Sequence, residues 1–141
     1  MRVLFIATRS SYGQIHGHKI GMGAYISALR ALGHEVTVAA FSVPGEVVDY
    51  EDLDAKTYYL PLPSYWRIAA NILKYGLLKR KSINECLYLE SSNFRCVHEI
   101  CRTNAIEFII ADMIRTAPYA EGVGVSRILD HEDLLSDRYC A

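Results

Sequence analysis

The sequence predicts an α/β fold in which an open parallel β-sheet carries helices on both of its faces. Short, continuous apolar runs rich in β-forming residues occur at residues 3–7, 34–41 and 106–111, as expected of strands buried on both sides. A segment with helical periodicity, residues 23–32, lies between the first two runs and completes a strand-helix-strand unit. At 141 residues the chain has the length of one compact domain, so we expect a single domain over residues 1–141.

The first unit follows from its apolar and glycine pattern. After the strand at residues 3–7, residues 8–23 are polar and glycine-rich, which favours a long turn with unusual φ angles. Apolar residues then recur at helical spacing, namely Tyr25, Ile26, Leu29 and Leu32. Gly33 follows where the end of a helix prefers a left-handed residue, and residues 34–41 form the second strand. A crossover of this kind is right-handed.

The rest of the chain continues the alternation of strands and helices. Residues 42–56 are acidic and contain a proline and a glycine, which is typical of a solvated connection. Ser64 is placed to cap an amphipathic helix at residues 65–75, and a capping-box sequence at residues 82–85 predicts that a helix restarts there. The other expected elements are a strand at residues 57–60, a helix that starts at Ser91 or Ser92 and includes residues 94–101, a strand at residues 106–111, a helical piece at residues 116–121 and a last strand at residues 126–129.

Composition excludes several classes of protein. The net charge is −1 and the isoelectric point is about 6.5, so no overall field attracts nucleic acid. The four cysteines form no CxxC pair, and His16 and His18 have no third ligand nearby, so neither zinc nor another metal is predicted. The first apolar run is too short for a signal peptide, and no stretch has the apolar length to span a bilayer. The expected location is the cytoplasm, with attachment to a membrane surface left open.

Candidate ligand sites are the loops at the carboxyl ends of the strands, where open α/β sheets bind their ligands. These loops follow Ala7, Phe41, Ala111 and Leu129. The first loop matches neither the dinucleotide motif GxGxxG nor the phosphate motif GxxxxGK followed by Ser or Thr. Its backbone amides, the helix N-terminus after it and Lys19 nevertheless suit an anionic or hydroxyl-rich ligand. The alternative is a surface turn that needs glycine for its geometry alone.

The segment after the last strand is dense in polar groups that suit sugar hydroxyls. Within nine residues it contains Asp130, His131, Glu132, Asp133, Ser136 and Arg138. Alternatively, Asp130 or Asp133 caps a helix and pairs with Arg138. Asp112 and Arg115 likewise form either a reactive-site pair or a surface ion pair of little energetic value.

Residues 65–81 combine an apolar arc with basic side chains. The arc consists of Tyr65, Trp66, Ile68, Ala69, Ile72, Leu73 and Tyr75, and the basic residues are Arg67, Lys74, Lys79, Arg80 and Lys81. Such a segment either packs its arc into the core or lies on an anionic membrane surface with Tyr65, Trp66 and Tyr75 as interfacial anchors. We prefer packing into the core, because most amphipathic stripes are core stripes.

Four segments together match a family pattern. They are residues 2–6 (RVLFI), 17–20 (GHKI), 28–37 (ALRALGHEVT) and 129–139 (LDHEDLLSDRY). In this order they resemble bacterial GT-B glycosyltransferases of the large retaining family, family 4-like, that builds polysaccharides and glycolipids. The last segment resembles that family's Asp-x-x-Asp-x-x-Ser-x-Arg-Tyr sequence. The likeness covers both ends of the chain, and the middle is consistent with it.

The resemblance implies a Rossmann-like domain that is the amino-terminal, acceptor-side half of a GT-B fold. It implies transfer of a sugar from a nucleotide sugar, as co-substrate, to a saccharide or lipid-linked acceptor, with neither a cofactor nor a metal. Gly17 and Lys19 match positions near the donor phosphates, although His18 stands where a second glycine is usual and Lys19 where arginine is commoner. The donor-binding domain has no counterpart within these residues, so the chain alone is expected to be inactive.

The general base is not identified by the pattern. The candidate catalytic residues are Asp112, Asp130 and Asp133. The expected acceptor-binding residues are Asp112, Arg115, Asp130, Asp133 and Arg138.

Three classes of function remain open. The first is a transferase domain, or the acceptor-binding subunit of a split transferase. The second is a non-catalytic Rossmann-like binding module, and the third is another nucleotide-dependent enzyme such as a reductase. The missing GxGxxG motif, and Phe41 and Ser42 in place of an acid at the end of the second strand, count against the third class.

Overall fold

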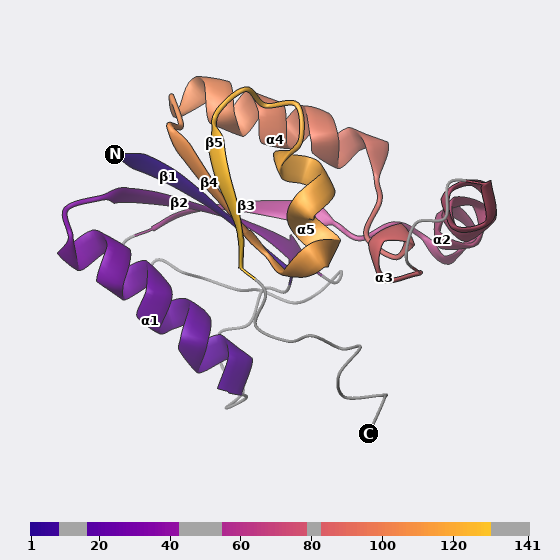
Figure 1. Cartoon of the computed structure of the whole chain (residues 1–141), viewed down its shortest axis with the longest axis horizontal. Coiled ribbons are helices and arrows are strands. Elements are labelled where there is room, and N and C mark those ends of the chain that lie inside the picture. Colours follow the sequence, from indigo (N-terminus) through magenta and orange to yellow (C-terminus); the bar gives the residue numbers. More distant parts are fainter. Residues whose placement is uncertain (9–16, 43–54, 79–82, 131–141) are drawn as a thin grey trace.

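A computed structural model describes residues 1–8, 17–42, 55–78 and 83–130 of the chain. It contains one sheet of five parallel strands in the order β3-β2-β1-β4-β5 (Figure 1). The strands are β1 (Arg2–Ala7), β2 (Glu35–Ser42), β3 (Lys56–Pro61), β4 (Phe108–Asp112) and β5 (Ser126–Asp130). The predicted fold class, an open parallel Rossmann-like α/β sheet, is therefore confirmed.

Helices cover both faces of this sheet. In Figure 1, α1 (Gly17–Ala31) lies below the sheet, and α4 (Ser91–Thr103) and α5 (Met113–Ala120) lie above it. The alternation of side chains along β1 explains why two cores form, because successive strand residues point to opposite faces. Val3, Phe5 and Ala7 pack with Met22 and Ile26 of α1. On the other face, Leu4 and Ile6 pack with residues of α4 and α5, among them Val97, Ile100 and Tyr119.

The start of α1 differs from the sequence prediction. Residues 17–23, expected to belong to a long glycine-rich loop, are helical, so that interpretation was wrong for this stretch. The reason is tertiary packing: Met22 and Ile26 are buried against the sheet, and this burial outweighs the low helix propensity of the glycines. The earlier part of the predicted loop, residues 9–16, lies outside the described residues.

The end of α1 is a Schellman motif. The amide of Gly33 donates to the carbonyl of Arg30 at 2.8 Å, and the amide of His34 donates to that of Leu29 at 3.0 Å. Gly33 has a φ of 80°, in the left-handed region that glycine enters without a steric penalty. The predicted stop of the helix at Gly33 is confirmed.

Replacing Gly33 by alanine should lower the free energy of unfolding by about 1 kcal/mol. A Cβ at this position would meet no atom within 4 Å, so the expected loss comes from the backbone conformation alone. Urea denaturation measures it. Gly33→Asn is the control, because asparagine tolerates this conformation better and should lose less. Equal losses for the two variants would contradict the assignment.

The segment after β3 contradicts the preferred prediction that its apolar arc packs into the core. It folds into α2 (Tyr65–Asn71) and a π-helical turn, η2 (Ile72–Leu77), and neither contains a buried residue. A short helix, α3 (Ile83–Cys86), follows and confirms the expected restart there. Figure 1 shows α2 at the far right of the molecule, away from the helices that cover the sheet. The arc is divided instead: Ile68, Ile72 and Tyr75 are half-buried, and Tyr65, Trp66 and Leu73 are exposed.

A buried tyrosine ties α3, α4 and α5 together. The Tyr119 hydroxyl accepts a hydrogen bond from the backbone amide of Glu90 at 2.8 Å and donates one to the carbonyl of Tyr88. Its ring packs against Phe41 and Phe94. Burial raises the pKa of Tyr119 to about 12, so the folded protein holds this phenol neutral.

Tyr119→Phe is expected to cost about 1–3 kcal/mol, because it leaves a buried amide and a buried carbonyl without their partner. The substitution should also make the free energy of unfolding depend less on pH in the alkaline range. The unfolded chain releases the Tyr119 proton near its ordinary pKa of 10 and the folded chain only near 12, so wild-type stability falls between these values. Denaturation at several pH values compares the variant with Tyr25→Phe, a control at a half-exposed ring. Parallel profiles for all three proteins would contradict the expectation.

Candidate functional site

The order of the strands reverses its direction at the border between β1 and β4. From β1 the chain passes through α1 to β2 on one side, and from β4 it passes through α5 to β5 on the other. This reversal is the topological switch point, outside whose strand ends α/β proteins bind ligands. The carboxyl ends of the two strands are marked by Thr8 and Asp112. The candidate site is this rim.

Asp112 and Thr8 are joined directly across the switch point. The Asp112 carboxylate accepts a hydrogen bond from the Thr8 backbone amide at 3.0 Å and another from the Thr8 hydroxyl at 2.8 Å. Both side chains are buried. Thr116 of α5 donates from its hydroxyl to the Asp112 carbonyl at 2.8 Å, which anchors the start of that helix. The predicted site residue Asp112 therefore also holds β1 to β4.

The backbone directly after Asp112 adopts an unusual conformation. Met113 has a φ of 64°, in the left-handed region, although it is not a glycine. Such residues carry backbone strain and concentrate at functional sites, where surrounding structure holds them. The turn from β4 into α5 is thus strained at the rim itself.

The carboxyl end of β5 also lies at the rim. Asp130 is the register partner of Asp112 on the neighbouring strand, so the structure brings these two predicted carboxylates to the same edge of the sheet. Asp130 is half-buried. The other two predicted residues of this segment, Asp133 and Arg138, lie outside the described part of the chain.

The structure places Arg115 at a different contact from the predicted one. Its guanidinium lies over the ring of Tyr88, 5.5 Å from the ring centre. This stacking directs Arg115 toward the segment that precedes α4. A role in acceptor binding remains a prediction for it.

The helix that follows β1 begins at the same edge. Gly17 and Lys19 lie in the first turn of α1, and α1 returns from the carboxyl end of β1 to the amino end of β2. The first amides of a helix have no partner within the helix, and the helix dipole is positive there. Both residues therefore belong to a helix N-terminus near the rim, in place of the predicted loop.

Sequence reasoning missed Thr8, the buried partner of Asp112. The signal that identifies it is its position, because it is the first polar residue after the apolar run of β1. Its partner is 104 positions away, and no local pattern links the two.

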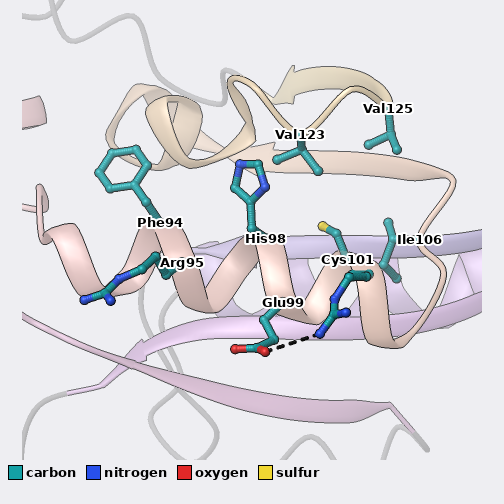
Figure 2. A pocket seen from close by; sticks show the side chains of 9 residues that line it. Phe94, Arg95, His98, Glu99, Cys101, Ile106, Val123 and Val125 are labelled. Atoms are coloured by element: carbon teal, nitrogen blue, oxygen red, sulfur yellow. Dashed lines mark ion pairs between the residues drawn. The ribbon is translucent and has the colours of Figure 1, made fainter.

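A concave region lies between α4 and the connection from α5 to β5. It is a groove of about 720 Å³, lined by Phe94, Arg95, His98, Glu99, Cys101, Arg102, Ile106, Val123 and Val125. Figure 2 shows Phe94 and His98 projecting from α4 toward that connection. Ile106 and Val125 lie just before the amino ends of β4 and β5, so the groove extends along α4 to the edge opposite the rim. Burial raises the pKa of the Cys101 thiol to about 11, which leaves it protonated and a poor nucleophile.

Within the part of the chain that the structure describes, no three His, Cys, Asp or Glu side chains gather closely enough to ligate a metal ion. No helix within the same residues has the length and apolarity to cross a membrane.

Several solved structures have a similar fold, among them the following two. The chain is similar to the glycosyltransferase VinC, crystallised in complex with dTDP, at 22% identity and a TM-score of 0.56. That alignment covers 99% of this chain and 38% of VinC. The chain is also similar to the C-terminal domain of the PF1911 hydrogenase from Pyrococcus furiosus, at 13% identity and a TM-score of 0.55, over 92% of this chain and 89% of that domain. No family model and no curated protein matches the sequence.

Proposed function

We propose that this chain is the acceptor-side half of a GT-B sugar transferase, and that it is inactive by itself. The observation that carries the proposal is the alignment of nearly the whole chain, 99%, with 38% of the glycosyltransferase VinC. The family pattern at residues 2–6, 17–20, 28–37 and 129–139 supports the same assignment. The sugar would pass from a nucleotide sugar to a saccharide or lipid-linked acceptor, as in polysaccharide or glycolipid synthesis, and we place this chemistry in the cytoplasm.

In this proposal the rim between β1 and β4 faces the acceptor. Asp112 and Asp130 lie on neighbouring strands there, and carboxylates accept hydrogen bonds from sugar hydroxyls. We assign Asp133, Arg138 and Arg115 to the acceptor as well, on the sequence pattern. Asp112, Asp130 and Asp133 are the candidates for the general base.

The donor phosphates would approach the first turn of α1, where Gly17 and Lys19 lie. Helix dipoles and basic side chains offset the charge of a leaving diphosphate, so the reaction needs neither a metal nor another cofactor. The donor-binding half of the enzyme would supply the nucleotide pocket and close the rim.

A second candidate function is a non-catalytic Rossmann-like binding module. It is favoured by the mutual coverage of this chain and the hydrogenase domain, 92% and 89%, which matches domain to domain. The two candidates differ in their ligands, because a binding module of this fold takes a nucleotide at the switch point, whereas the transferase half takes a saccharide there.

An NMR titration of the purified, isotopically labelled chain tests the proposal. Saccharide acceptors should shift the amide signals of Thr8, Asp112 and Asp130, and nucleotides and nucleotide sugars should shift them little. Asp130→Asn should weaken saccharide binding about fivefold, because a charged hydrogen bond is replaced by a neutral one, a difference of about 1 kcal/mol. Tight nucleotide binding at the rim would favour the binding module. Saccharide shifts confined to the groove in Figure 2 would contradict the rim as the acceptor site.

A further inference from the structure

The segment formed by α2 and η2 holds large apolar side chains in contact with water. The exposed fraction is 91% for Tyr65, 87% for Trp66, 64% for Leu73, 72% for Leu77 and 80% for Leu78, which directly follows η2. We call these five side chains the outer face of the segment. Soluble monomers seldom expose so many large apolar side chains on one short segment, and a surface of this kind marks an interaction site.

The opposite side of the segment is attached to the body of the protein. Asn71 donates from its side-chain amide to the carbonyl of Leu89 at 2.7 Å and to that of Cys86 at 3.3 Å. Ile68, Ile72 and Tyr75 share its side of the helix at spacings of three and four residues, and all are half-buried. These contacts fix the rotation of the segment, so the outer face points away from the fold.

The segment and the sequence that directly follows it are basic in composition. Residues 65–81 contain five of the 15 basic residues of the chain and none of its 16 acidic residues, and two of the five, Arg67 and Lys74, lie within α2 and η2. Arg67 is ion-paired with Glu90. Lys74 remains exposed, with its ammonium 5.1 Å from the ring centre of Tyr75. The charge concentrated here selects an anionic partner.

We propose that the outer face docks this protein on the surface of an anionic lipid bilayer. Tyr and Trp side chains favour the membrane interface, because one end of the ring is apolar and the other end is polar. A helix of this kind lies in the plane of the interface with its apolar side about 5–10 Å deep, and its basic residues contact anionic headgroups. The proposal is independent of the function proposed above.

A second copy of the chain is a poorer occupant of the same face. A two-fold dimer brings identical patches together, so each basic segment would face its own copy and repel it. Leucine and aromatic side chains can enter the hydrocarbon of a bilayer without a complementary pocket, so a bilayer can cover this face without any shaped surface.

The chain contains one tryptophan, Trp66, and it lies on the outer face, so its fluorescence reports directly on docking. With phosphatidylcholine vesicles that contain about a third phosphatidylglycerol, we expect co-sedimentation and a blue shift of Trp66 emission at low salt. Bromines on the lipid acyl chains should quench that emission. Binding should weaken at about 0.5 M salt, where charges are screened beyond a few ångströms. Phosphatidylcholine alone should bind far less.

A matched pair of variants distinguishes binding through the outer face from nonspecific binding through any exposed apolar side chain. Leu77→Ser should weaken vesicle binding about tenfold, the transfer energy of one leucine side chain. Leu32→Ser is its control, because Leu32 is exposed to 73%, as Leu77 is to 72%, but lies beyond the end of α1. It should leave binding unchanged. Both side chains are mostly in water, so both variants should fold, which circular dichroism checks.

Three results would overturn the proposal. The first is the absence of vesicle binding at low salt. The second is an equal effect of Leu77→Ser and Leu32→Ser. The third is a concentration-dependent dimer in sedimentation velocity that Leu77→Ser abolishes, since a second copy would then cover the outer face.

Discussion

Asp112→Ala is expected to lower the free energy of unfolding by about 2–4 kcal/mol. The substitution removes the acceptor of two buried hydrogen bonds from Thr8, and each buried donor left without a partner costs about 1–3 kcal/mol. It also removes the side-chain link between the ends of β1 and β4, next to Met113, whose backbone is held in a strained conformation. Urea denaturation followed by circular dichroism measures the loss.

Asp112→Asn is the matched control for this prediction. Asparagine keeps an oxygen that accepts the two Thr8 hydrogen bonds, so it should cost only about 1 kcal/mol. A saccharide titration that fails with Asp112→Asn while the protein remains folded would indicate a role of the carboxylate charge in the acceptor site. Losses below about 0.5 kcal/mol for both variants would contradict the structural role of Asp112.

A double-mutant cycle measures the contribution of the Thr8 hydroxyl to stability separately from that of the Thr8 backbone amide. Thr8→Val keeps the shape of the side chain but removes the 2.8 Å hydrogen bond to Asp112, whereas Thr8→Ser retains it. The coupling between Thr8→Val and Asp112→Ala should be about 1 kcal/mol. A coupling near zero would show that the hydroxyl contributes nothing beyond the backbone amide.

The central strands were predictable because their burial requires a continuous run of apolar residues, which is visible in the local sequence. β1 and β2 were expected at residues 3–7 and 34–41 and are found at Arg2–Ala7 and Glu35–Ser42. Each is covered on both faces, so nearly every residue is apolar and the run stands out from its surroundings. The C-terminus of α1 was equally clear, since a left-handed residue after a helix strongly favours glycine.

Features decided by tertiary contacts were not predictable in this way. The glycines of α1 suggested a loop, but packing of Met22 against the sheet extends the helix back to Gly17. The arc of α2 and η2 has the same periodicity whether a core or a membrane covers it, so sequence alone could not decide its exposure. The strand order, which creates the switch point, depends on contacts between distant parts of the chain.

The candidate site was predictable in location but not in construction. Parallel strands end at one edge, so the residues after β1, β4 and β5 had to meet there once the strands were recognised. Asp112 and Asp130 do lie at one edge, because they are register partners, and their part in binding a ligand stays a prediction. The contact between Asp112 and Thr8 was not foreseen, since the two residues are 104 positions apart.

The 141-residue chain alone is expected to release no measurable nucleoside diphosphate from UDP-, GDP- or dTDP-sugars, with or without saccharide acceptors. The physical reason is that the rim supplies one wall of the proposed cleft, and a leaving diphosphate needs donors positioned on both sides to stabilise its charge. Complete enzymes commonly turn over at about 10 per second, and we expect a rate below about 0.001 per second here.

A coupled assay for the released nucleotide, with a protein-free blank, measures this rate. Asp112→Asn separates a rate of the chain itself from a contaminant, because only the chain's own rate would respond to that change. Turnover well above the blank that Asp112→Asn abolishes would show that this lobe holds donor and acceptor unaided, and the proposal of a half-enzyme would then be wrong.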